Sequence, residues 1–243
     1  MLSDIKSHVT RPASFFTTEP IIIALGIYLV IIYVLNFMFL NGFEFIFTNT
    51  YDLSPGLTNT AFVGITIGAF LSTLTSPLFW LNNKNKTSFQ SKTLRSNARD
   101  TEAYAFKSEP PEIRLWPSIV LAPFLAISLF WLGWTNYPSI NPLVGYGATI
   151  LFGFALTSIF VSSYQYIIQS YGSAASSALG SITLVRYTVS GAMIIATRPT
   201  YQGIGVHWTL TLLGIIATVL VPVPYMIYKY GPKLREKSKF AEE

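Results

Sequence analysis

Long runs without a charged residue dominate the chain. They occupy positions 20–43, 53–83, 115–185 and 199–228. A membrane-spanning helix needs about 20 consecutive, mostly apolar residues, so each run is long enough for at least one span. The pattern predicts an all-α membrane protein.

The third run is too long for one helix, and two groups of turn-forming residues divide it. Two prolines and an asparagine lie in the segment 137–142, and Gly172 follows Tyr171. Proline cannot continue a helix, and glycine is a common helix stop. The pattern therefore predicts six transmembrane helices that form one bundle. The predicted spans are about 20–47, 58–81, 116–136, 143–169, 175–198 and 207–229.

The composition agrees with a membrane protein and narrows its chemistry. Only 11% of the 243 residues are charged, against roughly 25% in soluble domains, which excludes a water-soluble globule. The chain has no cysteine, and its histidines are His8 and His207. Thiolate metal sites, cysteine nucleophiles and histidine clusters are thus excluded. We expect no catalytic residue, no metal and no cofactor, and the chain is not expected to be an enzyme.

The basic residues lie on one side of the predicted topology. Of the 16 Lys and Arg, 14 lie in the segments 1–19, 82–115 and 229–239. Cationic loops stay in the cytoplasm, which predicts a multi-pass protein with both termini cytoplasmic. Residues 1–19 then form a cytoplasmic linker, 82–115 a cytoplasmic loop and 230–243 a basic tail. These cations are expected to contact anionic membrane lipid rather than nucleic acid.

Few ionisable residues lie within the predicted spans. Arg186 is about eleven residues into the fifth span, where a buried charge is costly and needs a partner or a water-filled cavity. It either binds an anionic substrate group or holds a carboxylate ionised, or it snorkels and pairs with helix-end carbonyls. Glu44 and Glu19 lie at the two ends of the first span. Either could carry a proton, and Glu44 is a weak proton-carrier candidate, but their position at the membrane interface favours plain solvation.

Polar and aromatic residues form a stripe on the first span. Tyr28 and Asn36 share a helical face by their spacing, and Tyr33 lies beside it. Tyr164 and Gln165 belong to a polar cluster near the cytoplasmic end of the fourth span. These side chains line a substrate path or only pack against neighbouring helices.

Small residues predict close helix contacts. Gly64 and Gly68 form a GxxxG pattern in the second span, which lets two helix backbones approach closely. Serines and alanines are dense at the start of the fifth span, and packing is the expected role of both groups.

Channel signatures are missing from the sequence. It has neither paired NPA motifs nor a TVGYG filter loop. A six-helix bundle with both ends inside and a long basic middle loop most resembles half of a repeat-built secondary transporter.

Several segments, in order along the chain, carry a more specific resemblance. They include Phe62–Gly68, Pro111–Leu115 (a PExRL-like segment), Leu184–Tyr187 and Pro222–Tyr225. Together they resemble the C-terminal half, helices seven to twelve, of fungal multidrug or polyamine proton antiporters of the major facilitator superfamily. The resemblance covers nearly the whole chain and implies a major facilitator fold.

The resemblance also implies a function. It predicts a transporter half for proton-coupled export of drugs, polyamines or other small molecules by alternating access, in the plasma membrane. The implied partners are lipid, substrate, protons, and a missing N-terminal six-helix half or a second copy. The chain is then expected to be truncated. A non-transporting truncated protein, or an interaction partner of intact transporters, is the alternative, and a six-helix pore is a third one.

One segment departs from the family pattern. The family's glutamate at the end of this first helix aligns with Asn41, which is a further substrate-path candidate, and Glu44 falls where a proline is usual. A proton role therefore does not transfer to Glu44. Arg186 stands where the family has an arginine in helix eleven, which makes it the leading candidate for the substrate path.

Overall fold

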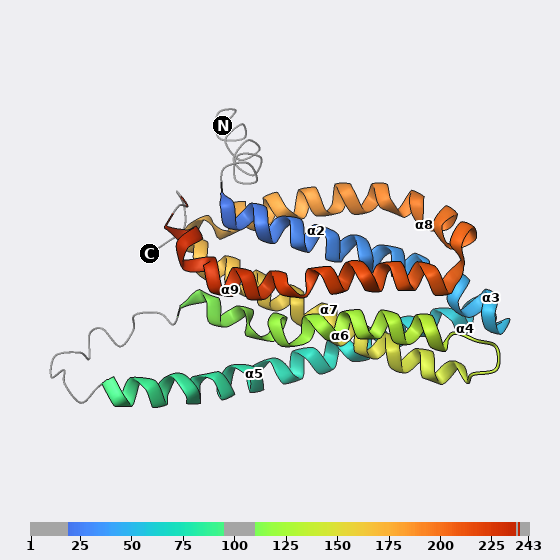
Figure 1. Cartoon of the computed structure of the whole chain (residues 1–243), viewed down its shortest axis with the longest axis horizontal. Coiled ribbons are helices and arrows are strands. Elements are labelled where there is room, and N and C mark those ends of the chain that lie inside the picture. The colour runs from blue at the N-terminus through green and yellow to red at the C-terminus, as the bar shows by residue number, and fades with distance from the viewer. Residues whose placement is uncertain (1–18, 95–109, 237, 239–243) are drawn as a thin grey trace.

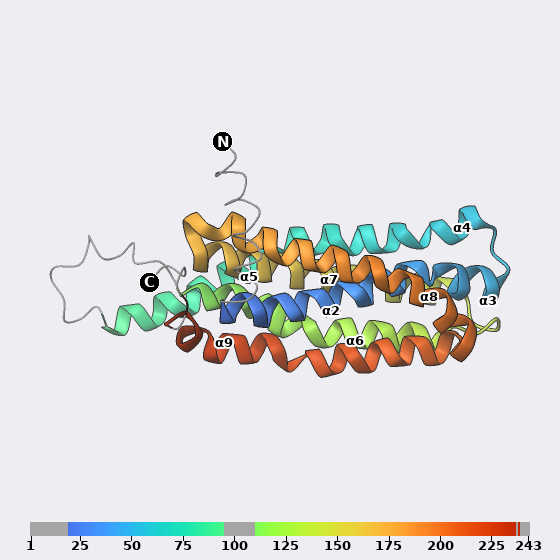
Figure 2. The same ribbon diagram turned by 90° about the horizontal axis from the view of Figure 1, so that it is seen from above.

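The apolar runs form long helices in a computed structural model that describes residues 19–94, 110–236 and 238. The helices lie along the long axis of the molecule (Figures 1 and 2). Most of the predicted linker 1–19, residues 95–109 of the predicted loop, and residue 237 and residues 239–243 of the predicted tail lie outside the described residues.

In the described part, six long helices form the bundle and five short ones lie between them. The long helices are α2 (Pro20–Asn41), α5 (Ala61–Leu94), α6 (Trp116–Thr135), α7 (Pro142–Tyr171), α8 (Ala175–Leu220) and α9 (Pro222–Arg235). The short ones are η1 (Glu44–Thr48), α3 (Asn49–Tyr51), α4 (Pro55–Asn59), η3 (Pro111–Leu115) and η4 (Gly172–Ala174). The described residues contain no strand.

Four continuous helical stretches are long and apolar enough to cross a membrane. They are Pro20–Asn41, Gly56–Pro77, Pro111–Thr135 and Pro142–Arg235, the last with 94 residues. The backbone of that last stretch changes direction at Gly172 (φ 41°) and Gly205 (φ 78°), so it crosses three times. The described part thus forms an all-α bundle of six transmembrane helices, which confirms the predicted fold class.

Glycine makes the return between the fifth and sixth crossings. The helical hydrogen bonding of α8 runs from Ala175 to Leu220, with only Gly205 outside helical backbone angles. A φ of 78° is costly for residues with a Cβ. The chain therefore turns here without a separate loop, and the second arm of α8 continues into α9 as the sixth crossing (Figure 1).

Helix α5 is longer than its apolar run. It continues to Leu94, whereas the second span was predicted to end near residue 81. The charge-free pattern marks only the part of the helix that fits into a membrane. The helix can continue beyond it, because its backbone hydrogen bonds do not require apolar side chains. Proline and asparagine do end the next crossing as expected, because α6 stops at Thr135 and α7 begins at Pro142 with Asn141 as its N-cap.

The packing order places the two ends of the bundle. Helix α7 packs between α5 and α6, and α8 packs against α2 and α6. The starts of α2 and α6 and the ends of α5 and α9 lie at one end of the bundle, which we call the tail end. Helices α3 and α4 and the turn within α8 lie at the opposite end (Figure 1).

Glycines bring α5 and α7 into backbone contact. A Cβ added to Gly68 would lie 2.6 Å from the backbone nitrogen of Phe154, and one added to Gly153 would lie 2.8 Å from the Cα of Ile65. Real Cβ atoms do not approach so closely, so only glycine fits at these positions. The close approach predicted from Gly64 and Gly68 is confirmed for this helix pair.

Candidate functional site

Arg186 lies within a group of aromatic rings from three helices. Its guanidinium carbon is 4.2 Å from the ring centre of Tyr33 on α2, 5.2 Å from Phe160 and 5.7 Å from Tyr164 on α7, and 5.0 Å from Tyr187 on α8. A cation is attracted to the face of such rings within about 6 Å. We call Arg186 and these four rings the arginine cage.

The guanidinium of Arg186 is buried without a carboxylate. The residue is 7% exposed, and its Nε has no hydrogen-bond partner. The ion pairs among the described residues join Arg198 to Glu44 and Arg235 to Glu112. Rings offset part of the cost of burying a charge, but a buried cation normally needs an anion. The cage therefore lacks a counter-charge among the described residues.

The structure brings together only some of the predicted path residues. Tyr33 and Tyr164 join Arg186 in the cage. Tyr28 (2% exposed) and Asn36 (9% exposed) are buried in the core of the bundle. Asn41 is exposed and donates from Nδ2 to the carbonyl oxygen of Phe37 at 2.8 Å.

The two glutamates of the first crossing have different surroundings. Glu44 is exposed, and its Oε1 lies 3.9 Å from Nη2 of Arg198. Glu19 is fully buried, accepts a hydrogen bond from Tyr171 Oη at 3.1 Å and contacts Ser238 Oγ. The expectation that Glu19 is solvated is wrong, because α7 and the tail segment cover it.

A second buried contact joins the tail to the start of the third crossing. Arg235 at the end of α9 forms an ion pair with Glu112 on η3, with 3.0 Å between Nη2 and Oε1. The side chain of Glu112 is 6% exposed. A Cβ at Gly231 would lie 3.0 Å from Glu112 Oε1, so glycine leaves room for this carboxylate. The tail end is thus held by contacts between α9, η3 and α7.

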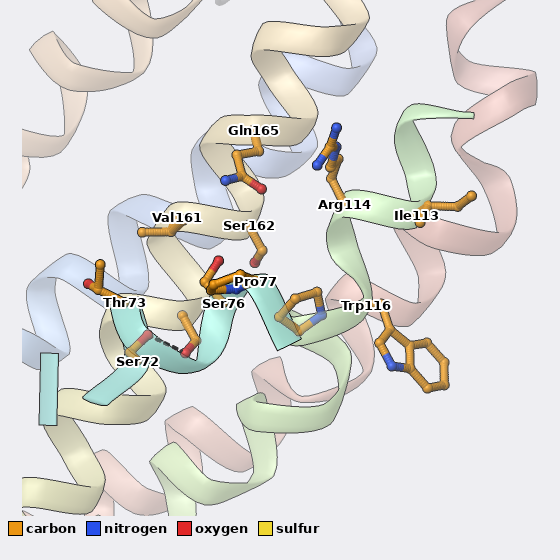
Figure 3. A pocket seen from close by; sticks show the side chains of 12 residues that line it. Ser72, Thr73, Ser76, Pro77, Ile113, Arg114, Trp116, Val161, Ser162 and Gln165 are labelled. Carbon is orange, nitrogen blue, oxygen red and sulfur yellow. Dashed lines mark hydrogen bonds between the residues drawn. The ribbon is translucent and has the colours of Figure 1, made fainter. Parts of the chain in front are cut away.

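A cavity of about 390 Å³, lined by polar and apolar side chains, lies between α5, α7 and the η3–α6 segment. Figure 3 shows Ser72 and Ser76 reaching it from α5, and Gln165 and Arg114 from opposite sides. The hydroxyls of Ser72 and Ser158 are 2.6 Å apart. Twelve residues line this cavity: Ser72, Thr73, Ser76, Pro77, Ile113, Arg114, Trp116, Pro117, Ser158, Val161, Ser162 and Gln165.

The path candidate Gln165 lines this cavity, whereas Tyr164 faces the arginine cage. Adjacent residues on a helix point about 100° apart, so α7 serves the two sites with different faces. Arg186 is not among the cavity residues.

The spacing of serines in two spans is a sequence signal for this cavity. Ser72 and Ser76 on α5, and Ser158 and Ser162 on α7, are each four residues apart, and Gln165 follows three residues later. Such spacing puts side chains on one face of each helix. Facing polar stripes on two helices indicate a polar cavity, but the pairing of α5 with α7 was needed to bring them together.

The described residues contain no group of histidines and acids suited to a metal ion. This finding concerns residues 19–94, 110–236 and 238 alone. The polar groups of both sites are hydroxyls, an amide and guanidinium groups, which bind by hydrogen bonding and charge.

Known proteins that resemble the chain are fungal transporters. It is 42% identical over 233 residues to the MFS-type transporter kojT of Aspergillus flavus, covering 95% of this chain and 39% of that protein. It is 32% identical over 239 residues to the efflux pump FUB11 of Gibberella moniliformis, covering 98% of this chain and 38% of that protein. It is 30% identical over 236 residues to the major facilitator superfamily multidrug transporter mdrA of Aspergillus fumigatus, covering 97% of this chain and 36% of that protein.

These matches cover little more than a third of each relative. The chain spans about two fifths of the length of the relatives that it matches, which is consistent with the C-terminal half of such a protein. No family model and no solved structure matches the chain.

Proposed function

We propose that this chain is the C-terminal half of a proton-coupled exporter. The support is its similarity to fungal transporters of the major facilitator superfamily, of which it spans about two fifths. Its substrates would be drugs, polyamines or other small molecules. In repeat-built transporters the substrate binds near the bilayer midplane between two bundles. A six-helix bundle supplies one wall of such a site, so the second wall would come from an N-terminal bundle or a second copy.

The buried, unpaired guanidinium of Arg186 carries this proposal. Arg186 is about eleven residues into α8, and a rise of about 1.5 Å per residue places it roughly 16 Å from the start of the helix. Among the described residues, no carboxylate forms an ion pair with this cation. An anionic substrate group, or a proton-exchanging carboxylate of the opposite wall, would supply the missing charge.

The rings of the cage support a role in binding. Tyr187 is 54% exposed, although it contacts Arg186 and Tyr33. The cage therefore reaches the surface of the bundle on the α2–α8 side. Aromatic rings bind the apolar parts of drug-like molecules, and Arg186 would orient a charged group beside them.

We also propose that the protein is located in the plasma membrane and that the tail end of the bundle faces the cytoplasm. The support is the clustering of Lys and Arg in the segments that begin or end there. Protons would drive the export, and lipid would surround the bundle.

An accumulation assay in yeast cells tests the proposed function. Cells would express this chain joined to an N-terminal six-helix bundle, as the parent, Arg186→Gln or Arg198→Gln. We expect the parent and Arg198→Gln to lower the accumulation of test compounds until a protonophore is added. Arg186→Gln should reduce this export by about tenfold or more at equal expression. Equal export by all three would overturn the role of Arg186, and no protonophore-sensitive export from any would overturn the exporter proposal.

A further inference from the structure

The cavity between α5, α7 and the η3–α6 segment lies where the bundle meets the membrane surface. Arg114 immediately precedes the charge-free run that starts at Leu115, and Trp116 is 40% exposed. Arginine and tryptophan at the start of a span mark the headgroup level of a bilayer. The mouth of the cavity is therefore at headgroup level, at the tail end of the bundle.

The floor of the cavity lies deeper in the bundle. Ser72 precedes Ser76 by one helical turn on α5, and Ser158 precedes Gln165 by about two turns on α7. The hydrogen bond between Ser72 and Ser158 closes this inner side. The cavity is thus a recess with polar and apolar lining that extends from the headgroup level toward the apolar interior.

The charge of the cavity favours an anion. Arg114 is its cationic residue, and no Asp or Glu is among the described residues that line it. The Nε of Arg114 donates to Gln169 Oε1 at 3.0 Å, which fixes the side chain at the rim. A guanidinium matches the geometry of phosphate oxygens.

Hydroxyl and amide groups add hydrogen-bonding capacity behind this cation. Ser76, Ser162 and Gln165 line the same recess (Figure 3). Ser162 is 2% exposed and donates to the carbonyl oxygen of Ile159, which leaves its oxygen lone pairs as acceptors. The Ser162 oxygen can accept from hydroxyls of a phospholipid, and Ser76 and Gln165 can donate to its ester oxygens.

The cavity also has an apolar side. Val161, Ile113 and Pro117 line it together with the polar groups, and Val161 is 39% exposed. A small soluble anion would gain nothing from these side chains. An amphiphile with a phosphate at the rim and its glycerol part against Val161 would use both sides. The volume of about 390 Å³ lies within the usual range for small-molecule sites.

We propose that this cavity binds the headgroup of an anionic phospholipid from the leaflet at the tail end, with Arg114 on its phosphate. The bound lipid would join α5, α7 and the start of α6, which line the recess together. Because a ligand stabilises the state that binds it, the lipid would also stabilise the bundle. This proposal does not depend on transport activity.

Native mass spectrometry and thermal denaturation of the purified chain in neutral detergent test the proposal. The probes are phosphatidylinositol, phosphatidylcholine and inorganic phosphate. Arg114→Gln removes the positive charge at the rim. Val161→Trp fills the recess and keeps the charge of Arg114. Arg198→Gln is the matched control, because it removes an exposed cation near the opposite end. Circular dichroism shows whether each variant is helical.

We expect the parent and Arg198→Gln to bind phosphatidylinositol at least fivefold more tightly than phosphatidylcholine, with a higher melting temperature. Arg114→Gln should weaken this binding about tenfold, and Val161→Trp should abolish it. If Arg114→Gln fails to fold, Val161→Trp alone decides the result. Equal binding of both lipids, or unchanged binding to Val161→Trp, would overturn the proposal. Displacement of the lipid by millimolar inorganic phosphate would overturn it in favour of a soluble phosphate ligand.

Discussion

Arg186, which is buried, and Arg235, which is partly buried, show how differently one residue type is used in this bundle. Arg235 has a carboxylate, because its Nη2 lies 3.0 Å from Glu112 Oε1. Arg186 has four aromatic rings and an Nε without a partner. Removing a residue that holds the bundle together should lower its stability. Removing a residue that serves binding should leave the stability almost unchanged.

Arg186→Met and Arg235→Met should therefore differ in stability. Removing one partner of a buried ion pair costs about 3–5 kcal/mol, so Arg235→Met leaves Glu112 buried and unpaired and should lower the melting temperature by roughly 6 °C or more. Replacing an unpaired buried cation by an apolar residue is close to neutral or stabilising. Arg186→Met should melt within about 3 °C of the parent, or above it. Thermal denaturation in detergent measures both, and a larger loss for Arg186→Met would mean that the cage is structural.

The sequence identified Arg186 because a charge within an apolar run is conspicuous. It did not identify all of its neighbours. Phe160 is one apolar residue among many on α7, and only the packing of α7 and α2 around α8 places it beside the guanidinium. Glu19 was misjudged for a similar reason. Its position at the end of an apolar run indicated solvent, but Tyr171 and Ser238, which are distant in sequence, cover it.

At the scale of elements, helix contacts depend on where glycine is placed. Gly68 and Gly153 lie at the contact between α5 and α7, whereas Gly191 on α8 has no atom within 4 Å of an added Cβ. The GxxxG pattern indicated that α5 makes a close helix contact, but it did not show that α7 is the partner helix. Helix ends were readable from proline and Gly172. The return lies between the predicted fifth and sixth spans, 175–198 and 207–229, but the pattern did not show that it is made at Gly205 inside continuous helical hydrogen bonding.

Gly68→Ala and Gly191→Ala should have opposite effects on stability. The added methyl group at position 68 would meet backbone atoms of α7, and overpacking of this kind costs about 1–3 kcal/mol. At position 191 it meets nothing, and alanine favours a helix over glycine by about 0.8–1.0 kcal/mol. Thermal denaturation should thus give a lower melting temperature for Gly68→Ala and an equal or higher one for Gly191→Ala. An unchanged value for Gly68→Ala would mean that α5 and α7 are less close than described.

At the scale of the whole molecule, charge and fold agree on two distinct ends. The described ends of α5 and α9 and the starts of α2 and α6 lie together at the tail end (Figure 1). Most of the basic residues are in the segments that adjoin these positions. The lipid cavity that we propose lies at the same end, where anionic lipid and cationic loops would meet.

Single cysteines test the proposed orientation, because the chain has none of its own. Ser139→Cys places a thiol in the exposed connection between α6 and α7, and Glu236→Cys places one at the exposed end of α9. A membrane-impermeant maleimide should label Ser139→Cys in intact cells and Glu236→Cys only after permeabilisation. The reverse pattern would contradict the assignment of the tail end to the cytoplasm.

The central claim is that this bundle is one wall of a proton-coupled transporter. Flux into proteoliposomes under an imposed proton gradient tests it most directly, with the chain alone and with an N-terminal six-helix bundle from a relative. We expect gradient-dependent flux with both bundles present, loss of that flux in Arg186→Gln, and little change in Arg198→Gln. Equal flux with and without the gradient, or no flux from the assembled pair, would contradict the account.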